Sequence, residues 1–258
     1  MIKIENVETC GWEAAIRGMR NPKNSWEKSD SGWSNSWEYL SIRVNESKWG
    51  DSMFQYRSSN IDGPTDVFQD RPEYIIGPND LDLMTRLRNA GTDHRKFMRM
   101  ITVYLDITAP LYWWKEFDTY KVGTVADSCS TMHKIAAKEF ELDDFSHEHI
   151  INSVGMGAQE IEVRISPMQA LLTTIECLNS YRKLYLETKD KKYWWQMIQL
   201  LPSSYNQRRT IMLNYEVLAN IYKSRRNHKL DEWRELCAWI ETLPYSELII
   251  GKGENAGD

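Results

Sequence analysis

One stretch of the chain alternates apolar and polar residues, as a β-strand does, and continues almost at once into a segment with helical periodicity. Residues 99–107 (RMITVYLDI) have the first pattern, and residues 110–121 (PLYWWKEFDTYK) have the second, with Pro110 in the expected first turn. Four residues form the apolar face of the predicted strand: Ile101, Val103, Leu105 and Ile107. Three aromatic residues share one face of the predicted helix: Trp113, Phe117 and Tyr120. A strand joined so closely to a helix favours a fold of the α+β class.

The rest of the chain adds mainly helices to this pair of elements. Residues 2–7 alternate like a second strand, and the segment 23–77 is irregular apart from short strand-like pieces such as Tyr39–Val44. Helix patterns cover seven further segments: 11–20, 78–91, 129–139, 167–188, 190–200, 207–226 and 230–242. We expect Asn79 or Asp80 to cap the helix 78–91 and Gly91 to end it. No clear linker separates these elements, so we predict one domain over residues 1–258.

The charge and the cysteines limit the partners and the compartment. The formal net charge is −5, whereas proteins that bind nucleic acid polymers usually carry a basic excess. This balance still allows a local basic pocket for a single nucleotide. No apolar run reaches roughly 18 residues, so we expect no transmembrane helix, and the N-terminus lacks the apolar core of a signal peptide. The four cysteines form no C-x-x-C pair, which argues against a zinc or redox motif and favours the reducing cytoplasm.

Two local clusters have both a functional and a plain structural interpretation. His147, Glu148 and His149 are metal-ligand types, but two His on one helix face are normally three or four residues apart, so we predict no metal site. The basic run 223–229 (KSRRNHK) either binds phosphate through planar arginine donors or is a solvated helix end whose cations suit the helix dipole. The eleven Trp and thirteen Tyr suit ring stacking, subunit interfaces or core packing.

A His, a strand, a helix and a run of hydroxyl and acidic residues follow one another over residues 94–132. His94 precedes the predicted strand and helix, and TYKVGTVADSCSTM follows at 119–132. This order resembles the flavin-dependent thymidylate synthases, in which a His, a short strand and a helix lead into the motif R-H-R-x-x-S-x-N-E-x-S-x-R-Y. The segment 119–132 aligns with that motif without a gap.

Part of the motif keeps its chemistry in this chain. Lys121 keeps one positive charge, Thr124 keeps a hydroxyl, and Asp127 keeps a carboxylate. Cys129 stands at the second Ser, with Ser130 beside it. The remaining positions differ from the family's Arg, His, Asn, Arg and Tyr: they hold Thr119, Tyr120, Ala126, Thr131 and Met132.

A second segment, residues 200–236, resembles the family's C-terminal half, which has a Leu-Pro followed by a helix. Asn214, Asn220 and Arg225 match two Asn and one Arg of the family. The spacing of Asn214, Leu218 and Arg225 predicts that they share one face of the helix 207–226. The resemblance covers about 79–132 and 198–242, whereas the N-terminal region 1–78 and an insertion at 133–197 have no recognisable counterpart.

The resemblance implies a helix-rich α+β fold with a small antiparallel sheet and an active site at a homotetramer interface. It implies FAD as the cofactor, dUMP stacked on the flavin, methylenetetrahydrofolate as the carbon donor and NADPH as the hydride donor. It assigns Arg225 to polarising the uracil ring, with Cys129 and Ser130 beside the pyrimidine. The cofactor would contact His94, Tyr120, Lys121, Asn214 and Asn220. The substrate would contact Glu116, which stands near a family Gln, and Thr124, Asp127 and Thr131.

Two positions where the family has an arginine hold other residues here, which affects how tightly the phosphate of dUMP could bind. Glu216 stands at a family Arg, and Ile198 stands where the family has a nucleotide-binding Arg. Each charge-assisted bond to phosphate contributes about 1.5–3 kcal/mol, so losing two or three would weaken dUMP binding by orders of magnitude. The candidates to replace the lost charges are Arg99, Arg208 and Arg209.

Three functions stay open at this point. The first is a divergent flavoenzyme that methylates dUMP or a related pyrimidine nucleotide, and it predicts a yellow protein. The second is a non-catalytic protein of the same fold that sequesters a nucleotide, in a phage or defence setting, and it predicts nucleotide binding without flavin. The third is a structural protein whose helical bundle is unrelated to the family, and it predicts no affinity for small ligands.

Overall fold

Four strands form the main sheet, and they lie in the order β1-β4-β6-β5. They are β1 (Lys3–Cys10), β4 (Thr102–Pro110), β5 (Val125–Ser128) and β6 (Asn206–Asn214). β5 and β6 pair antiparallel, with Ala126 opposite Ile211 and Asp127 opposite Thr210. The four predicted apolar residues at 101, 103, 105 and 107 are all buried. A small antiparallel sheet among many helices confirms the predicted α+β class.

The computed structural model describes residues 2–34, 74–153 and 164–251, so the strand predicted at Tyr39–Val44 lies outside the described residues. The chain divides into two compact units. The first unit contains residues 1–8, 103–213 and 220–243, and the second contains residues 9–102, 214–219 and 244–258. Each unit therefore draws its residues from separate parts of the sequence.

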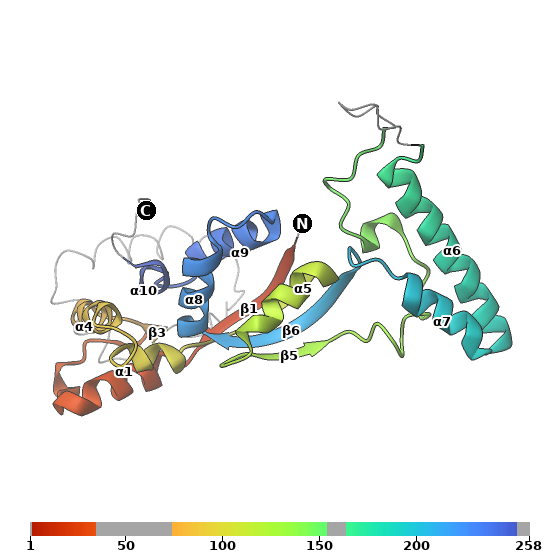
Figure 1. Cartoon of the computed structure of the whole chain (residues 1–258). Helices are drawn as coiled ribbons and strands as arrows, with labels where there is room; N and C mark the ends of the chain where they lie inside the picture. The colour runs from red at the N-terminus through yellow and green to blue at the C-terminus, as the bar shows by residue number, and fades with distance from the viewer. Residues whose placement is uncertain (1, 35–73, 154–163, 252–258) are drawn as a thin grey trace, which may run out of the picture. The chain divides into compact units, whose positions relative to one another are not determined.

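Helix α5 (Leu111–Phe117) lies across one face of β5 and β6 in the first unit (Figure 1). The Trp114 indole fixes it there, because Nε1 donates to the Gln207 carbonyl at 2.9 Å. Pro110 stands just before the helix with extended backbone angles, not in the first turn as predicted. The predicted helix 110–121 therefore becomes α5 followed by a 3-10 turn, η4 (Asp118–Tyr120).

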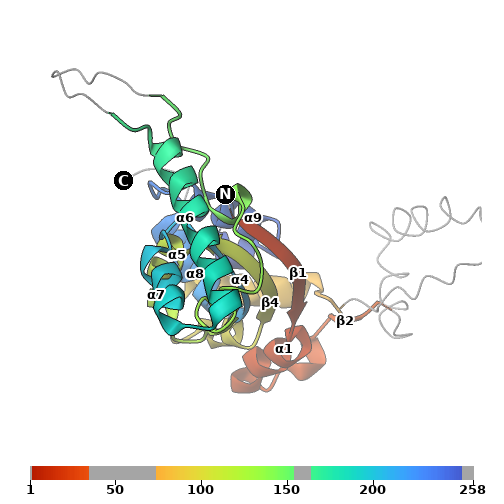
Figure 2. The ribbon, with the colours of Figure 1, turned by 90° about the vertical axis from the view of Figure 1, so that its right-hand side faces the viewer.

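Helices α6 (Pro167–Thr188) and α7 (Lys191–Leu200) lie side by side in the first unit, as Figures 1 and 2 both show. Ser166 caps α6 by accepting from the Gln169 amide, and Asp190 caps α7 by accepting from the Lys192 amide. Both helices confirm the predictions at 167–188 and 190–200. They enclose a core shared with the preceding loop: Ile135, Ala136, Phe140, Phe145, Leu171, Ile175, Leu178 and Met197.

One predicted helix is shorter than expected, and another is wrong. Residues 206–214 form the strand β6, and only Tyr215–Arg225 is helical (α8), so the helix predicted at 207–226 begins eight residues later than expected. β6 lies inside the sheet, between β4 and β5, where hydrogen bonds on both sides outweigh local helix preference. Residues 129–139 are turns rather than a helix. The Cys129 amide donates to the Arg208 carbonyl, which prolongs the pairing of β5 with β6.

The second unit contains α1 (Trp12–Arg20), α4 (Pro78–Asn89) and the last helix, α10 (Glu247–Ile250). Its short strands β2 (Gly32–Trp33) and β3 (Tyr74–Ile75) pair antiparallel. The predicted cap of α4 is wrong, because Gly77 occupies the cap position. The amides of Asn79 and Asp80 instead donate to the carboxylate of Asp30, at 2.8 and 3.0 Å, so a remote side chain caps this helix.

Asp80 is the centre of a buried polar network in the second unit. Its carboxylate accepts from Arg20 Nε at 2.6 Å and from the hydroxyls of Ser29 and Ser31 at 2.6 and 2.7 Å. Both charged side chains are almost fully buried, with 0% of Asp80 and 4% of Arg20 exposed. Burial alone would raise the pKa of Asp80, but the hydrogen bonds from Ser29, Ser31 and Arg20 outweigh it and lower the pKa below its ordinary value.

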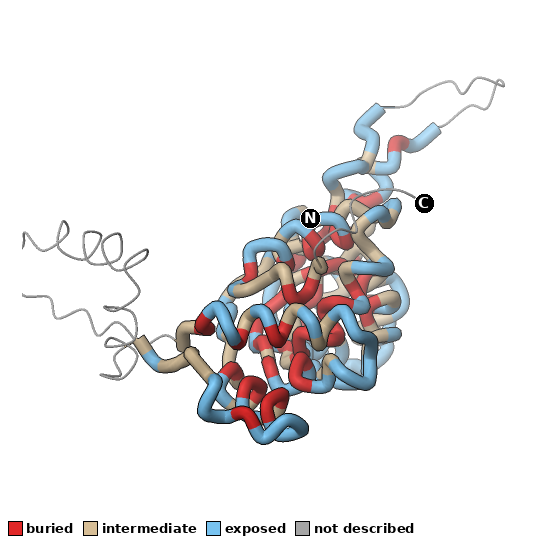
Figure 3. Tube along the Cα trace, turned by 90° about the vertical axis from the view of Figure 1, so that its left-hand side faces the viewer, coloured by how far each residue is buried: buried red, intermediate tan, exposed pale blue. Residues whose placement is uncertain are grey.

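The remaining elements are short 3-10 turns and one helix: η1 (Asn21–Lys23), η2 (Trp26–Lys28), η3 (Arg95–Arg99), η5 (Leu142–Asp144) and α9 (Asp231–Glu241). Helix α9 confirms the prediction at 230–242, whereas η3 delays the strand predicted from residue 99. Buried and exposed positions recur along the helices (Figure 3), as expected of amphipathic packing. Over the three described ranges, no helix is long and apolar enough to cross a membrane.

Candidate functional site

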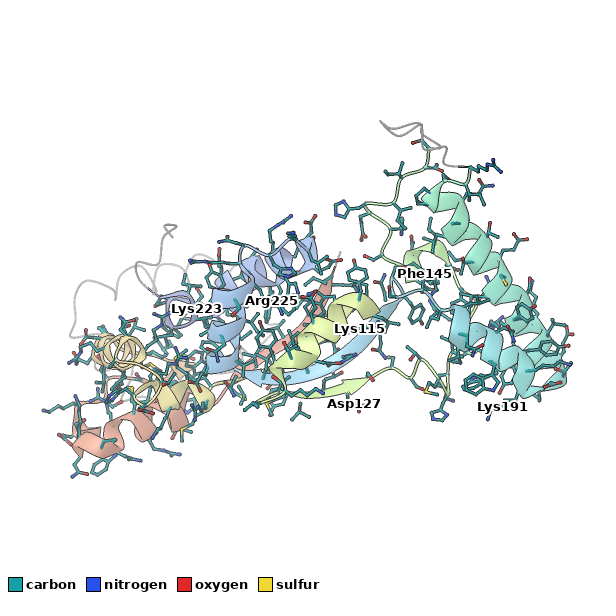
Figure 4. All side chains as sticks on the ribbon, viewed as in Figure 1. Lys115, Asp127, Phe145, Lys191, Lys223 and Arg225 are labelled. Carbon is teal, nitrogen blue, oxygen red and sulfur yellow. The ribbon has the colours of Figure 1, made fainter. Side chains whose placement is uncertain are left out.

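Arg225 ends helix α8 (Figure 4), and three side chains of the first unit fix its guanidinium. Its Nε donates to the Tyr120 hydroxyl at 3.0 Å, and its Nη1 donates to Glu116 Oε2 at 2.9 Å. The guanidinium carbon lies 4.6 Å from the centre of the Trp233 ring. The side chain is 19% exposed. An ion pair and an aromatic face therefore hold a positive charge in one place while leaving part of it accessible.

Glu116, on α5, is the counter-charge of Arg225. Its Oε2 accepts from Arg225 and from Trp233 Nε1 at 3.0 Å, and it lies 3.5 Å from His228 Nε2. Its Oε1 makes no hydrogen bond with any residue that the structure describes. One carboxylate oxygen is thus occupied by protein donors, and the other is left to accept from something else.

A stack of aromatic rings holds the two helices that carry these groups. The Trp113 and Phe117 rings of α5 are 5.1 Å apart, and Phe117 is 6.3 Å from Trp233 of α9, with an interplanar angle of 17°. All three side chains are almost fully buried. The Tyr112 hydroxyl also donates to Glu232, which links α5 to α9 a second time. Because these contacts fix both helices, Glu116 and Trp233 are positioned before any ligand binds.

The segment that resembles the family motif is mostly exposed. Lys121 and Asp127 have exposed side chains, and Cys129 and Ser130 are exposed directly after β5. The Ser130 hydroxyl accepts from the His133 amide at 2.9 Å, so it shapes the following turn. Thr131 is half-buried in that turn. The structure therefore brings these residues together in one loop–strand–loop segment, of which Figure 4 labels Asp127.

Thr124 carries an unusual hydroxyl. Its Oγ1 is shielded from solvent and has no hydrogen-bond partner among the residues the structure describes. The Thr124 amide donates to the Lys121 carbonyl at 3.3 Å, which closes a tight turn over residues 121–124. The same turn therefore carries the Thr124 hydroxyl and the exposed ammonium of Lys121. A buried hydroxyl without a partner costs free energy, which a bound ligand with an acceptor oxygen would recover.

Two of the three arginines predicted as phosphate contacts are ion-paired within the first unit. Arg208 donates to Asp106 at 2.5 Å, and Arg209 donates to Asp118 at 2.8 Å. Asp106 also accepts from Thr210 and Asn6, and these hydrogen bonds, led by that of Thr210, hold its pKa well below its ordinary value. The guanidinium of Arg209 in addition covers the Trp114 ring at 4.3 Å, outside the group around Arg225.

Three other residues predicted to contact the cofactor or the phosphate lie in the second unit: His94, Arg99 and Asn214. Arg99 and Arg95 both donate through Nε to Glu216, which stands where the family has Arg. Burial would raise the pKa of Glu216, but these hydrogen bonds lower it. His94 is exposed, directly before η3.

Asn214 does not lie on a helix face with Leu218 and Arg225, as the spacing predicted. It is the last residue of β6, and its Oδ1 accepts from the Val217 amide at 3.0 Å, so it caps α8. Asn220 lies on α8 and is exposed. Residue 214 precedes the first residue of α8, so the helical spacing to Leu218 and Arg225 does not apply to it.

Sequence reasoning missed two residues of the Arg225 group. Trp233 fitted the apolar stripe of the helix 230–242, and His228 fitted the basic run 223–229. Neither pattern distinguishes a core residue from one that also contacts a functional charge. One feature of the sequence does point to Trp233: it is an aromatic residue eight positions after Arg225. A short turn between two helices can bring residues at this separation together, as the turn between α8 and α9 does.

The sequence cluster at His147 to His149 makes ordinary contacts. His147 Nδ1 lies 2.7 Å from the Phe145 carbonyl, and His149 Nε2 lies 3.0 Å from Asp231 Oδ2. Within residues 2–34, 74–153 and 164–251, no group of three or more His, Cys, Asp or Glu is arranged to hold a metal ion.

Comparison with solved structures identifies proteins of similar fold. The chain matches a flavin-dependent thymidylate synthase, ThyX, from Helicobacter pylori, complexed with FAD and dUMP, with a TM-score of 0.56 and 16% identity over 95% of this chain and 98% of the other. A second structure of the Helicobacter pylori enzyme with FAD and dUMP gives a TM-score of 0.56 and 15% identity over 97% of each chain.

A UMP/dUMP methylase, PolB, from Streptomyces cacaoi, bound with 5-Br UMP, is also similar, with a TM-score of 0.51 and 12% identity over 94% of this chain and 88% of the other. No protein-family model matches the sequence, and no curated protein matches it. The likeness in fold therefore extends well beyond the two segments whose sequences carry the resemblance.

Proposed function

Because the chain has the fold of the flavin-dependent thymidylate synthases, we propose that it is a flavin-dependent enzyme that methylates the ring of a pyrimidine nucleotide, dUMP or a close relative. The proteins of similar fold bind FAD with dUMP, or a brominated UMP. We further propose a homotetramer in the cytoplasm, on the resemblance of the sequence to that family.

The observation that carries this proposal is the fixed cation of Arg225. Methyl transfer to a pyrimidine carbon requires charge to develop on the ring oxygens, and a preorganised guanidinium stabilises such charge best where water is partly excluded. Arg225 is held by Tyr120, Glu116 and Trp233 and is mostly buried. Its guanidinium therefore needs little reorganisation to polarise a ring.

The described residues also fit an anionic cofactor. Lys121 offers an exposed ammonium, and Thr124 offers a hydroxyl that no described residue satisfies. When bound, FAD supplies the redox chemistry, with NADPH and methylenetetrahydrofolate as the proposed hydride and carbon donors. The chain's own part is to bind the phosphates through Lys121 and Thr124 and to hold the pyrimidine at Arg225.

A non-catalytic role, the sequestration of a nucleotide without flavin, is favoured by one specific observation. The three arginines that could compensate for the altered motif are each paired with a carboxylate: Arg99, Arg208 and Arg209. An arginine neutralised in this way contributes less to phosphate binding, because the carboxylate competes with the phosphate for the same donors.

The visible absorption spectrum of the purified protein, before and after addition of FAD and desalting, tests the proposal. Flavin bands that survive desalting would support it and lead to a turnover assay with dUMP, methylenetetrahydrofolate and NADPH. A colourless protein that binds dUMP would favour sequestration. A colourless protein that binds neither FAD nor dUMP would refute both functions.

A further inference from the structure

The Glu116–Arg225 pair leaves unused hydrogen-bonding groups of both kinds close together. Glu116 Oε1 and Arg225 Nη2 make no hydrogen bond with any residue in the described part of the chain. The Glu116 side chain is 37% exposed and the Arg225 side chain 19% exposed. A ligand that reaches this pair therefore meets an open acceptor beside open donors.

Each of these groups can play only one role in a hydrogen bond. An ionised carboxylate only accepts hydrogen bonds, and a guanidinium only donates them. Because the acceptor belongs to Glu116 and all the remaining N–H groups belong to Arg225, we take the acceptor, Glu116 Oε1, to stand at one end of the pair. The base-pairing edge of guanine has the same order, an acceptor oxygen followed by two N–H donors, so the pair resembles that edge.

The complement of such an edge is cytosine. Its 4-amino group donates towards a carboxylate, and its N3 and O2 both accept from a guanidinium, which allows three hydrogen bonds. Uracil presents an acceptor, a donor and an acceptor in that order. It can give its N3–H to Glu116 and one oxygen to Arg225, which is two hydrogen bonds, and its other oxygen then meets no donor of this pair.

The pair is also rigid enough to discriminate. Trp233 donates to Glu116 and its ring lies against the Arg225 guanidinium, and the Tyr120 hydroxyl accepts from Arg225 Nε, so these contacts restrict the movement of both charged groups. A fixed carboxylate cannot switch to donating, as an amide could by rotating. The mismatch with uracil is therefore not relieved by a local side-chain movement.

We propose that the Glu116–Arg225 pair makes this site selective for a nucleotide with a 4-aminopyrimidine ring, a cytosine nucleotide, over one with uracil. This inference rests on the proposed function, because it takes the pyrimidine ring to lie at Arg225. It changes the substrate class while keeping the role of Arg225 as the group that polarises the ring.

Calorimetric titration of the full-length protein with dCMP and with dUMP tests this selectivity directly. We expect dCMP to bind at least about tenfold more tightly, which is the discrimination that one well-placed base-reading contact provides. Equal affinity, or tighter binding of dUMP, would overturn the selectivity while leaving a pyrimidine-nucleotide function in place. If neither nucleotide binds, with or without FAD, both the selectivity and the proposed function are wrong.

A variant pair then assigns the effect to the carboxylate. Glu116→Gln should reduce the preference for dCMP by about tenfold, because its amide can present either a donor or an acceptor. Glu139→Gln removes the same charge from an exposed position elsewhere in the first unit and should keep the preference. A preference that persists in a folded Glu116→Gln protein would overturn the assignment. If that variant melts at low temperature, the wild-type titration still decides the selectivity.

Discussion

Replacing Asp80 by Asn should strongly destabilise the second unit, because it leaves the Arg20 guanidinium buried without a counter-charge. Arg20 is 4% exposed and Asp80 is 0% exposed, and they are joined by a 2.6 Å hydrogen bond. Breaking a buried pair by removing one partner costs about 3–5 kcal/mol, whereas an exposed pair contributes only about 0–1 kcal/mol. The substitution also weakens the hydrogen bonds that Ser29 and Ser31 donate to this carboxylate.

The same helix provides the matched control. Asp82 pairs with Arg86 at 2.8 Å, but both side chains are more than 60% exposed, so Asp82→Asn should cost about 0.5 kcal/mol or less. Urea unfolding, with hydrogen exchange of the α4 amides to report on the second unit, compares the two variants. Similar losses of stability for Asp80→Asn and Asp82→Asn would refute the reasoning, since burial would then make no difference.

The pH dependence gives an independent check on Asp80. Its pKa in the folded protein is lower than its ordinary value, so the ionised carboxylate stabilises the folded state at pH values above the unfolded pKa of about 3.9. That stabilisation is lost as the pH falls towards the folded pKa. Asp80→Asn should remove this part of the acid sensitivity, so that the stabilities of wild type and variant converge as the pH is lowered.

Three further predictions concern single residues. Arg225→Ala should lower turnover by at least about a hundredfold while light scattering shows unchanged assembly, because a fixed charge at the ring is lost; unchanged turnover would contradict its role. Cys129 should react with a thiol reagent in the native protein, whereas Cys237, which is 3% exposed and whose pKa burial raises to about 12, should react only after unfolding; rapid labelling of both would contradict this. Asn214→Ala should cost about 1 kcal/mol through loss of the α8 cap, and Asn214→Asp should restore most of it; equal stability of all three proteins by urea unfolding would exclude the cap.

The sequence predicted those elements best that carry their own periodicity. Helix α6 repeats apolar residues at helical spacing and has a Ser before Pro167, so local signals alone define it. Strand β6 could not be predicted in this way. Two adjacent arginines interrupt its alternation, and its conformation depends on pairing inside a sheet whose other strands lie far away in sequence.

The candidate site shows the same division. Arg225 and Glu116 could be proposed from the resemblance, and the structure places them in contact. Trp233 could not, since its place in an apolar stripe explains it fully until the fold brings α9 against α5. The sequence does not show the boundary between β6 and α8, so its spacing predicts a helix face for Asn214 that the strand excludes. The sequence thus indicates which side chains are candidates for the site, whereas the tertiary fold determines which of them are in contact.

The carboxylate of Glu216 limits which single substitutions its neighbourhood tolerates. Arg95 and Arg99 both converge on it, where the resemblance expects an arginine. The single substitution Glu216→Arg would place three guanidinium groups together and create repulsion where there is now attraction. An arginine at this position is therefore compatible with the fold only if Arg95 or Arg99 changes as well. The three side chains thus constrain one another, and the arrangement tolerates paired changes better than single ones.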